Sequence, residues 1–391
     1  MAMLIDPGES TREDLERYVK RGGYLGLARA VRDGPSAVLA AVERAGLRGR
    51  GGSGLGEPVA RKWREAAAVP GTTKFVIANG AESHPESRKD HLLMTRYPHR
   101  ILEGLLIAGV AVRARQCFVY VKETYNDALA SIKEAIAEGL AAGAWAGLEM
   151  EITVFEAPAS PAAGEESAVI DAIEGFNPPR PRLRPPSVTS VGLYGRPTVV
   201  NNVETLAAAA AVMRTGEPAG TVLVTLTGDV RRPGVYEVPL GTPLRAIVED
   251  WGGGAPGPLL CVLPGGSASG PLGPAELELP LDYDALWRAG TSLGPAVLSV
   301  VAGAGRKPGD PFQDAARLWT SGSCGQCRLC QEGTAELLDA AQRIVQGANS
   351  AREDMELWAL RLRGKGNCLY ATMVARSAAR WLRVFGNELS G

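Results

Sequence analysis

The sequence lacks the long apolar run that a membrane-spanning helix requires. Its longest apolar stretch, Leu105–Val112, is bounded by Glu103 and Arg113 and falls far short of the roughly 20 residues that cross a bilayer. The first ten residues carry two carboxylates and no extended apolar segment, so we expect no signal peptide. We therefore expect a soluble, cytoplasmic protein without a membrane span. Any association with the inner face of a membrane would come through partner subunits.

An excess of charge of one sign is also lacking. The 391 residues include 42 Lys and Arg against 43 Asp and Glu, a net charge of -1, which gives no electrostatic reason to expect nucleic acid or an anionic membrane surface as a partner. Hydrophobic residues make up 45% of the chain and charged residues 22%, as in soluble globular proteins. A chain of this length predicts two to three domains.

Cysteine is sparse and unevenly placed. Three of the six cysteines fall within one short segment, whereas Cys117, Cys261 and Cys368 are scattered. A disulfide framework would be spread more evenly and would suit a small secreted chain. The clustering therefore indicates a metal site in a reducing compartment. Cys117 and Cys261 lie in apolar runs, which favours small buried thiols over ligands.

The clustered cysteines have the spacing C-x2-C-x2-C. Cys324, Cys327 and Cys330 cannot share one face of an ideal helix, because residues three apart rotate by about 300°, so they require a loop around a compact object. A [4Fe-4S] cube can bind three such thiolates and take a fourth cysteine from elsewhere, and Cys368 follows a glycine-bearing turn. Zinc sites usually show two separated C-x2-C pairs, and a redox C-x-x-C needs no third cysteine. Both remain the less favoured alternatives.

The first half of the chain alternates strands and helices. Apolar spacing predicts helical structure over 12–46, and the proline- and arginine-rich segment 176–197 is not expected to be regular. The other predicted elements are strands at 74–78 (ended by a turn at Asn79-Gly80), 117–121 and 152–155, and helices at 98–113, 126–140 and 203–213. This alternation predicts a parallel sheet flanked by helices.

Two further regions follow. Strands at 222–226, 234–238, 259–263 and 296–301, with a helix at 244–251, predict a small mixed unit of β-grasp type. From Pro311 onward the chain is expected to be almost entirely helical, with the cysteine cluster between the first two helices. We place the domain limits at 1–216, 217–302 and 303–391.

Residues 46–54 form a glycine-rich segment, Gly-Leu-Arg-Gly-Arg-Gly-Gly-Ser-Gly. Successive glycine N–H groups can form a nest for an anion, and Arg48 and Arg50 add positive charge. The segment does not match G-x-x-x-x-G-K-S/T, which argues against a P-loop. From these residues alone, a phosphate-bearing cofactor and a plain surface turn both fit.

Taken together, these motifs resemble the flavoprotein subunit of respiratory complex I and its relatives in NAD-linked hydrogenases and formate dehydrogenases. The resemblance covers residue 47 to the end. It rests on the glycine-rich segment, Asn-Gly-Ala-Glu-Ser-His-Pro at 79–85, Gly-Glu-Glu-Ser at 164–167, Gly-Arg-Pro-Thr-Val-Val-Asn-Asn-Val-Glu-Thr at 195–205, the β-grasp motif at 228–239 and Ser-Cys-Gly-Gln-Cys at 323–327. The fold it implies is α/β multidomain, with a Rossmann-like flavin domain, a β-grasp (ubiquitin-like) domain and a C-terminal helical bundle that carries the iron-sulfur cluster.

The resemblance also implies cofactors and residue roles. FMN and NAD would bind beside the [4Fe-4S] cluster, and electrons would pass from NADH through FMN to the cluster. The phosphate and flavin contacts it implies come from Gly49, Arg50, Gly51, Gly52 and Gly54. Further implied roles are cofactor contacts by Lys62, Asn79, Glu82, Ser83, Asn201 and Asn202, catalytic positions over the nicotinamide for Glu165 and Glu166, and metal ligation by Cys324, Cys327, Cys330 and Cys368. From the residues alone, Asn201-Asn202 also fits a helix N-cap, and Glu165-Glu166 fits the acidic first turn of a helix.

The chain departs from the family at the donor site. After the glycine-rich segment it is two residues longer and lacks a Phe, and Glu65 and Ser187 stand where the family has aromatic residues. Ala81 replaces an Asp, His84 a Glu and Pro161 a Tyr. Each lost aromatic stack is worth about 1 kcal/mol, so the three together would weaken NADH binding by roughly a hundredfold.

Three functions stay open on the sequence. They are an NADH:acceptor (quinone-type) oxidoreductase subunit with a divergent donor pocket, an electron-transfer subunit of the same fold that has lost NADH and serves another donor or acceptor, and a non-catalytic scaffold that carries the cluster. Each of these functions implies protein partners, because a chain that holds one flavin and one cluster must pass its electrons on to another protein. The resemblance implies a small [2Fe-2S] thioredoxin-like subunit and a larger iron-sulfur or metal-dependent oxidoreductase subunit, and no nucleic acid.

Overall fold

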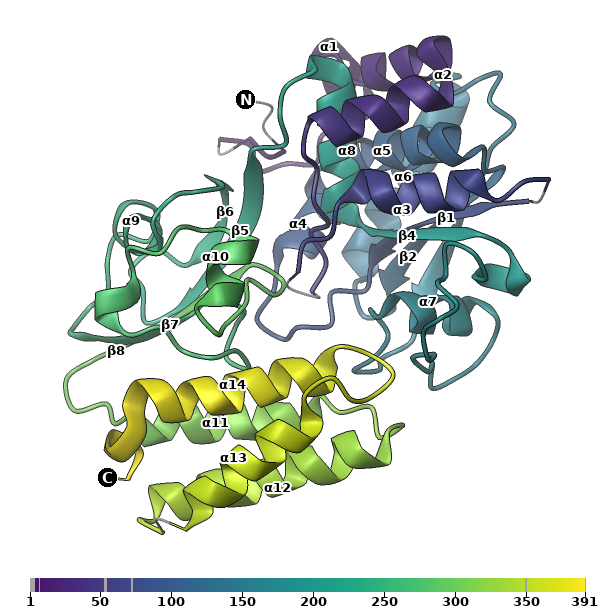
Figure 1. Cartoon of the computed structure of the whole chain (residues 1–391). Coiled ribbons are helices and arrows are strands. Elements are labelled where there is room, and N and C mark those ends of the chain that lie inside the picture. Colours follow the sequence, from purple (N-terminus) through teal and green to yellow (C-terminus); the bar gives the residue numbers. More distant parts are fainter. Residues whose placement is uncertain (1–3, 7, 53–54, 72, 349, 391) are drawn as a thin grey trace.

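Two four-stranded sheets and a helical bundle follow one another in the described part of the chain (Figure 1). The computed structural model describes residues 4–6, 8–52, 55–71, 73–348 and 350–390. No helix within these ranges is both long and apolar enough to cross a membrane.

The first sheet is entirely parallel and has the order β3-β2-β1-β4. Its strands are β1 (Phe75–Gly80), β2 (Gln116–Lys122), β3 (Glu151–Ala157) and β4 (Thr198–Asn202). Successive side chains of a strand point to opposite faces, so Val76 and Ala78 join one hydrophobic core while Phe75 and Ile77 join another. Both faces are therefore covered, as in doubly wound α/β domains.

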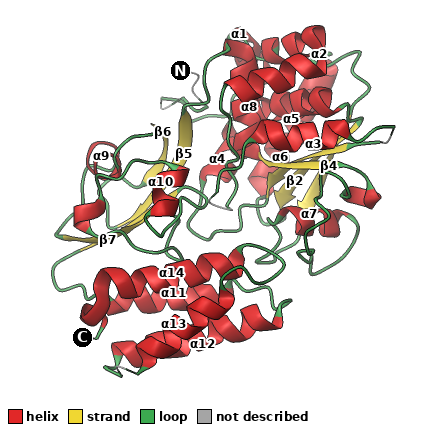
Figure 2. Ribbon diagram, viewed as in Figure 1, coloured by secondary structure: helices red, strands yellow, loops and turns green. Residues whose placement is uncertain are grey.

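Helices cover the two faces of this sheet unequally (Figure 2). On the face of Val76 pack α3, α5, α6 and α8, with α2 outside them, whereas the other face receives α7 and the segment after it. These helices are α1 (Leu15–Lys20), α2 (Leu25–Arg44), α3 (Val59–Ala68), α4 (Lys89–Arg96), α5 (Pro98–Val112), α6 (Asn126–Ala141), α7 (Glu166–Ile173), η1 (Leu193–Gly195) and α8 (Val203–Thr215). The prediction of a parallel sheet flanked by helices is confirmed.

Two local predictions need correction, and one strand was missed. The N-terminal helical segment is broken near Gly22, whose φ of 83° lies in the left-handed region, so that α1 and α2 are separate. The predicted turn at Asn79 and Gly80 is wrong, because both residues continue β1 and pair with β2. Strand β4 was not predicted, because its short apolar run lies directly between an irregular segment and a helix.

The second sheet is mixed and has the order β6-β5-β8-β7. Strand β5 pairs antiparallel with β6 and parallel with β8, and β7 pairs antiparallel with β8. Its elements are β5 (Thr221–Gly228), β6 (Gly234–Pro239), α9 (Leu244–Ala246), the π-helix η2 (Ile247–Trp251), β7 (Leu259–Leu263), η3 (Pro274–Glu276), α10 (Tyr283–Arg288) and β8 (Val297–Ala302). The helix predicted at 244–251 is thus one α-helical turn that widens into a π-helix.

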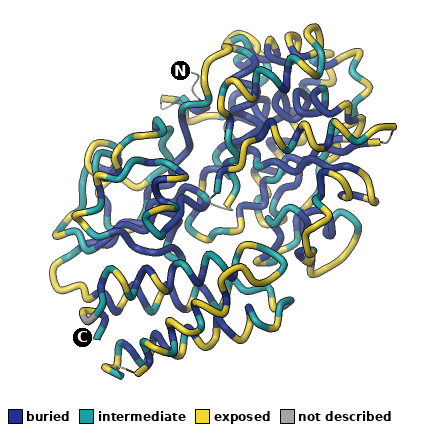
Figure 3. Tube along the Cα trace, in the orientation of Figure 1, coloured by how far each residue is buried: buried dark blue, intermediate teal, exposed yellow. Residues whose placement is uncertain are grey.

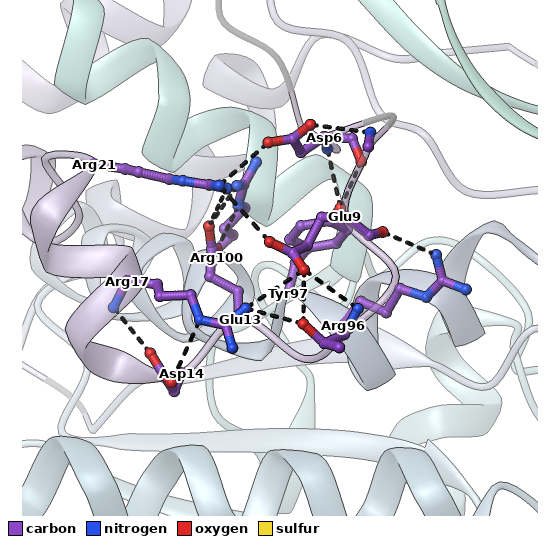
Figure 4. A network of polar contacts seen from close by, with 11 residues as sticks. Asp6, Glu9, Glu13, Asp14, Arg17, Arg21, Arg96, Tyr97 and Arg100 are labelled. Atoms are coloured by element: carbon purple, nitrogen blue, oxygen red, sulfur yellow. Dashed lines mark hydrogen bonds and ion pairs between the residues drawn. The ribbon is translucent and has the colours of Figure 1, made fainter.

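Charged residues tie the N-terminal segment to both sheets, and Figure 4 shows its contacts with the helices of the first. Both carboxylate oxygens of the buried Glu13 accept hydrogen bonds from Arg100 of α5, at 2.7 and 2.8 Å, and Arg21 adds a third at 3.1 Å. The backbone N–H of Leu4 donates to Glu237 of β6 at 2.6 Å. The segment therefore links the helices of the first sheet to an outer strand of the second.

The C-terminal region is a four-helix bundle, coloured yellow-green to yellow in Figure 1. Its helices are α11 (Gly309–Ser321), α12 (Arg328–Val345), α13 (Ala351–Leu362) and α14 (Tyr370–Phe385), followed by η4 (Gly386–Leu389). The bundle core is built around Trp319 and Trp381, and it also includes Cys261 and Val301 from the second sheet. Because this core is shared, the domain limits at 216 and 302 stay a prediction.

Candidate functional site

Three loops converge at the carboxyl ends of strands in the first sheet. The glycine-rich segment lies against the end of β4, since a Cβ added to Gly51 would sit 3.8 Å from the Cβ of Asn202. The carboxyl end of β1 contacts the loop before α7, because Asn79 Nδ2 donates to the carbonyl of Gly164 at 2.9 Å. In open parallel sheets, ligands bind outside this edge. The structure thus brings together residues from three of the predicted motifs, and we call this region the donor edge.

The glycine-rich segment offers backbone donors to this edge. The N–H groups of Gly49 and Arg50 are bound by protein acceptors. Within the described ranges, those of Gly51 and Gly52 have no protein acceptor at hydrogen-bonding distance, and a Cβ on Gly52 would meet nothing within 4 Å. Two adjacent free amides beside open space fit an anionic phosphate. Gly54 lies outside the described residues.

The Arg50 side chain is buried in an ion pair with Glu204 of α8, at 2.9 Å. Lys89 contacts the second oxygen of that carboxylate at 3.0 Å, and the backbone N–H of Leu223 in β5 donates to the first at 2.9 Å. Burial alone would raise the pKa of Glu204, but Lys89 and Arg50 outweigh it and hold that pKa below its ordinary value. The guanidinium of Arg50 therefore fixes the glycine-rich segment to α8, and its contact with a cofactor phosphate stays a prediction.

The turn after β1 is held by Glu82. Its carboxylate accepts hydrogen bonds from the backbone N–H groups of Asp90 and His91 at the start of α4, both at 3.1 Å. Ser83 is exposed, and its Oγ would lie 2.6 Å from a Cβ added to Gly164, so a side chain at position 164 would force the Ser83 hydroxyl to move. Glu82 thus shapes the turn, and the contacts of Glu82 and Ser83 with a cofactor stay predictions.

The Gly-Glu-Glu motif begins α7 and lies in a charged network. Glu165 is the N-cap, and its carboxylate accepts from the backbone N–H of Ser167 at 2.9 Å, as the helix-start alternative expects. Glu166 contacts Lys62 and lies 2.6 Å from a guanidinium nitrogen of Arg184, which also contacts Glu165. Burial would raise the pKa of Glu166, but Lys62 and Arg184 hold it below its ordinary value. The network keeps this carboxylate ionised at the donor edge.

Asn201 and Asn202 end β4, and protein groups bind both amides. Asn201 Oδ1 accepts from the indole N–H of the buried Trp63 at 2.7 Å. Asn202 is the N-cap of α8, accepts from the backbone N–H of Glu204 at 3.0 Å and donates to Asp90 at 2.7 Å. The N-cap alternative therefore describes Asn202, and the roles of both residues toward flavin stay predictions.

Two of the departures from the family meet in space. Thr189 Oγ1 lies 3.1 Å from a carboxylate oxygen of Glu65 and 2.7 Å from Ser187 Oγ. These contacts connect α3 to the segment after α7. A hydrogen-bonded polar chain thus occupies two positions at which an aromatic residue would stack on a planar ring.

The cysteine-rich loop lies between α11 and α12, as predicted. Cys327 is the N-cap residue of α12, and Cys330 lies in its first turn. Gly325 has a φ of 74°, a left-handed conformation that other residues rarely adopt. This glycine therefore allows the chain to turn back between Cys324 and Cys327.

The loop between α13 and α14 brings Cys368 to the same end of the bundle. A Cβ added to Gly366 would sit 3.8 Å from the sulfur of Cys327, and the backbone N–H of Asn367 donates to that sulfur at 3.3 Å. Hydrogen bonds to cysteine sulfur are one of the ways in which a protein tunes an iron-sulfur cluster. The predicted fourth ligand thus adjoins the other three.

Electrostatics join Cys368 to its neighbours and to the donor edge. The pKa of Cys368 is raised to about 11, chiefly by burial and in smaller part by negative charge on Glu165, Cys324 and Cys330, against a lowering backbone contact. Glu165 caps α7, so the start of that helix lies close to the cluster loop. The two predicted redox sites are therefore neighbours in the fold.

The four cysteine sulfurs are not gathered around one point in the described structure. Within the described ranges, no three His, Cys, Asp or Glu side chains lie close enough together to hold one metal ion. A cube binds its thiolates at separate iron corners, whereas a tetrahedral zinc ion draws all four ligands onto one atom. Cys117 and Cys261 are fully buried in β2 and β7, and burial raises the pKa of each thiol to about 12. They behave as the small core residues that were predicted.

Sequence reasoning missed Arg184, Lys89 and Glu204 as site residues. Arg184 lies in a proline-rich segment without periodicity, so nothing marked it as the partner of both carboxylates of the Gly-Glu-Glu motif. Lys89 and Glu204 are fully buried, yet buried charges leave no sequence pattern of their own. The one available signal was the position of Glu204 directly after Asn201-Asn202-Val203.

Comparisons with known families agree with this geometry. Residues 42–211 match the Nuo51 FMN-binding domain, residues 223–267 match the SLBB domain, and residues 311–391 match the NADH-ubiquinone oxidoreductase-F iron-sulfur binding region. The first match contains the donor edge and the last contains all four cluster cysteines. The prediction of an FMN and a [4Fe-4S] cofactor is confirmed at this level.

Whole-chain relatives point the same way. An NADH-quinone oxidoreductase subunit of Mycobacterium bovis is 36% identical, over 90% of this chain and 82% of the relative, and its counterpart in Streptomyces coelicolor is 34% identical, over 96% and 87%. A crystal structure of an NAD+-reducing [NiFe]-hydrogenase in the H2-reduced state superposes with a TM-score of 0.85 at 29% identity, over 97% of this chain but 66% of the hydrogenase chain. The chain belongs to the NADH-quinone oxidoreductase-F family.

Proposed function

We propose that the chain takes electrons from NADH at the donor edge of the first sheet and delivers them singly through the cysteine-held cluster at the end of the bundle. Bound flavin and cluster supply the conversion between a two-electron hydride and single electrons, and the protein positions them. The observation that carries the proposal is the hydrogen bond from the side-chain amide of Asn367, the neighbour of Cys368, to the carbonyl of Pro181 at 3.0 Å, which joins the cluster loop to the segment that supplies Arg184 to the donor edge.

Each part of the chain has a task in this function. The free amides of Gly51 and Gly52 would bind the flavin phosphate. Lys62 and Arg184 hold the carboxylate of Glu166 in place and ionised, and Arg184 also contacts Glu165, where the nicotinamide would lie. These groups come from α3, α7 and the loops at the carboxyl edge of the first sheet, and their mutual contacts hold them in place, which is what preorganised binding requires.

An anaerobic titration with NADH tests the proposal. Flavin absorbance should bleach on addition of NADH, with the cluster reduced afterwards. Dithionite provides the control, because it reduces both centres regardless of the donor site. Bleaching by dithionite alone would rule out NADH as the donor.

One observation favours a second function, an electron-transfer subunit of the same fold that does not use NADH. The hydrogen-bonded chain of Glu65, Thr189 and Ser187 replaces aromatic surface at the place where a dinucleotide ring would stack. This function retains the flavin and the cluster. The same titration separates it from the first.

Protein partners follow from either function. The relatives carry the name of a subunit, and a chain with a single cluster must pass electrons to another protein. We propose a small [2Fe-2S] thioredoxin-like subunit and a larger iron-sulfur or metal-dependent oxidoreductase subunit, with the assembly in the cytoplasm or at the inner face of the membrane. Co-purification of the tagged chain from its native cells, followed by metal analysis of the captured subunits, tests this assignment.

A further inference from the structure

Exposed apolar side chains gather in two segments of the described chain. Of its eleven exposed large hydrophobic residues, four fall within 176–194 and three within 357–369. Leu183 is 70% exposed, Leu360 69% and Tyr194 61%. The first segment follows α7, and the second runs from α13 into the loop that carries Cys368. A concentration of exposed apolar side chains of this kind is a candidate interaction site.

The two segments are in direct contact beside the cluster loop. The side-chain amide of Asn367 donates to the carbonyl of Pro181 at 3.0 Å, while the backbone N–H of the same residue donates to the sulfur of Cys327. Figure 1 shows the loop between α13 and α14 lying against the segment after α7. The two segments therefore lie on either side of the loop that carries Cys368, and both include exposed stretches of chain (Figure 3).

These segments are also strongly basic. Residues 176–196 contain four arginines and residues 357–369 contain two arginines and a lysine, and neither range contains a carboxylate. Within the described residues, Arg361, Arg363 and Lys365 have no carboxylate partner within 4.0 Å. At the opposite end of α12, Arg343 pairs with both Asp339 and Asp354. In the first segment, Arg182 and Arg184 pair with carboxylates in and beside α7. The positive charge without a carboxylate partner at this end of the bundle therefore lies mainly on the second segment, at Arg361, Arg363 and Lys365.

We propose that residues 176–196 and 357–369 form the docking surface for an acidic electron-carrier protein, which takes electrons from the cluster one at a time. One electron leaves the chain at each encounter and reduces the oxidised centre of the carrier, with no atom transferred. The inference deepens the proposed function and rests on its cluster. A second copy of this chain would bring like charges together, and an anionic lipid surface would not accept the electron. Apolar contact surrounded by complementary charge fits a fast, reversible carrier.

A stopped-flow experiment on the full chain tests the surface without relying on NADH. The chain is reduced with a stoichiometric amount of dithionite and mixed with an acidic [2Fe-2S] ferredoxin or with the neutral quinone menadione. The ferredoxin rate should fall steeply with ionic strength. Arg361→Glu combined with Arg363→Glu should slow it about tenfold or more and leave the menadione rate unchanged. Equal ferredoxin rates in wild type and variant would overturn the docking surface.

Matched variants guard against indirect effects. Lys20→Glu combined with Arg44→Glu reverses two exposed cations in α1 and α2, far from the bundle in Figure 1, and should leave the ferredoxin rate unchanged. Leu360→Ser should slow the ferredoxin reaction severalfold at high salt, where charge is screened. If the charge-reversal variant loses its cluster absorbance, Arg361→Gln combined with Arg363→Gln serves in its place, with a smaller loss expected.

Other occupants of the surface give distinct results. Sedimentation would reveal self-association, and flotation with phosphatidylglycerol vesicles would reveal lipid binding. If the chain self-associates or binds these vesicles, and the charge-reversal variant loses that binding but keeps the ferredoxin rate, the surface does not dock a carrier protein. Failure of NADH to bleach the flavin would count against the proposed donor alone, because the dithionite-reduced chain would still deliver electrons.

Discussion

The cluster loop and the donor edge use their characteristic side chains in opposite ways. At the cluster loop the cysteine sulfurs make few contacts with protein: Cys327 accepts one backbone N–H, and Cys330 lies 3.7 Å from a serine hydroxyl. At the donor edge the carboxylates and amides are already occupied, since Glu82 anchors α4, Glu165 caps α7 and Asn202 caps α8. A polar residue in a cofactor motif can thus serve the cofactor by shaping the loop, whereas a cysteine ligand must stay free.

Removing a cluster thiol should have the largest effect, because no other group replaces it. We expect Cys327→Ser to lose the visible absorbance of the cluster and nearly all electron delivery to a protein acceptor. Anaerobic spectra with iron and sulfide analysis measure this. Cys117→Ser, a buried thiol in β2, is the control and should keep full iron content. Full iron content in the Cys327 variant would show that cluster binding does not depend on Cys327.

On the donor side, the sharpest test is the buried ion network behind the glycine-rich segment. Glu204→Ala leaves Arg50 and Lys89 buried without their shared partner, which typically costs about 3–5 kcal/mol of unfolding free energy. Chemical denaturation of the flavin-loaded chain measures this. The exposed pair of Arg64 and Glu43 gives a control, because Glu43→Ala should cost about 1 kcal/mol or less. Similar losses in the two variants would mean that burial does not set the strength of the network.

The start of α7 should show a pH dependence of defined sign. Because the folded-state pKa of Glu166 is held below its ordinary value, its ionised form stabilises the fold above the unfolded-state pKa of about 4.3, and that contribution disappears as the pH falls through the folded-state pKa. The stability difference between wild type and Glu166→Gln should therefore be constant near neutral pH and shrink in acid. Denaturation curves across this pH range provide the measurement. A difference that grows in acid would contradict the ion network.

The smallest expected effect concerns the rebuilt donor pocket. Ser187→Phe restores an aromatic ring beside the donor edge and should tighten NADH binding by about 1 kcal/mol, roughly fivefold. The apparent affinity from anaerobic flavin bleaching measures it. Ser187→Leu adds apolar volume without a stacking ring and is the matched control. An equal gain from leucine would assign the effect to burial rather than to stacking.

Sequence reasoning succeeded where one local pattern determines one structure. The apolar runs of β2 and the spacing of Cys324, Cys327 and Cys330 are local signals, and both the strand and the position of the cysteine loop follow from them. It failed for β4, whose short apolar run resembles many irregular segments. It also failed for the pairing of Arg50 with Glu204, which joins residues 154 positions apart. Such a contact depends on tertiary packing and leaves no periodicity to detect.

The link from Glu204 to the backbone of Leu223 also limits how the chain can be divided. A fragment that ended at residue 216 would retain a buried carboxylate and lose one of its donors, together with the strand that helps to keep water away from it. A flavin module transplanted into another protein should therefore include β5, because the hydrogen bond from Leu223 to Glu204 crosses the boundary between the two modules.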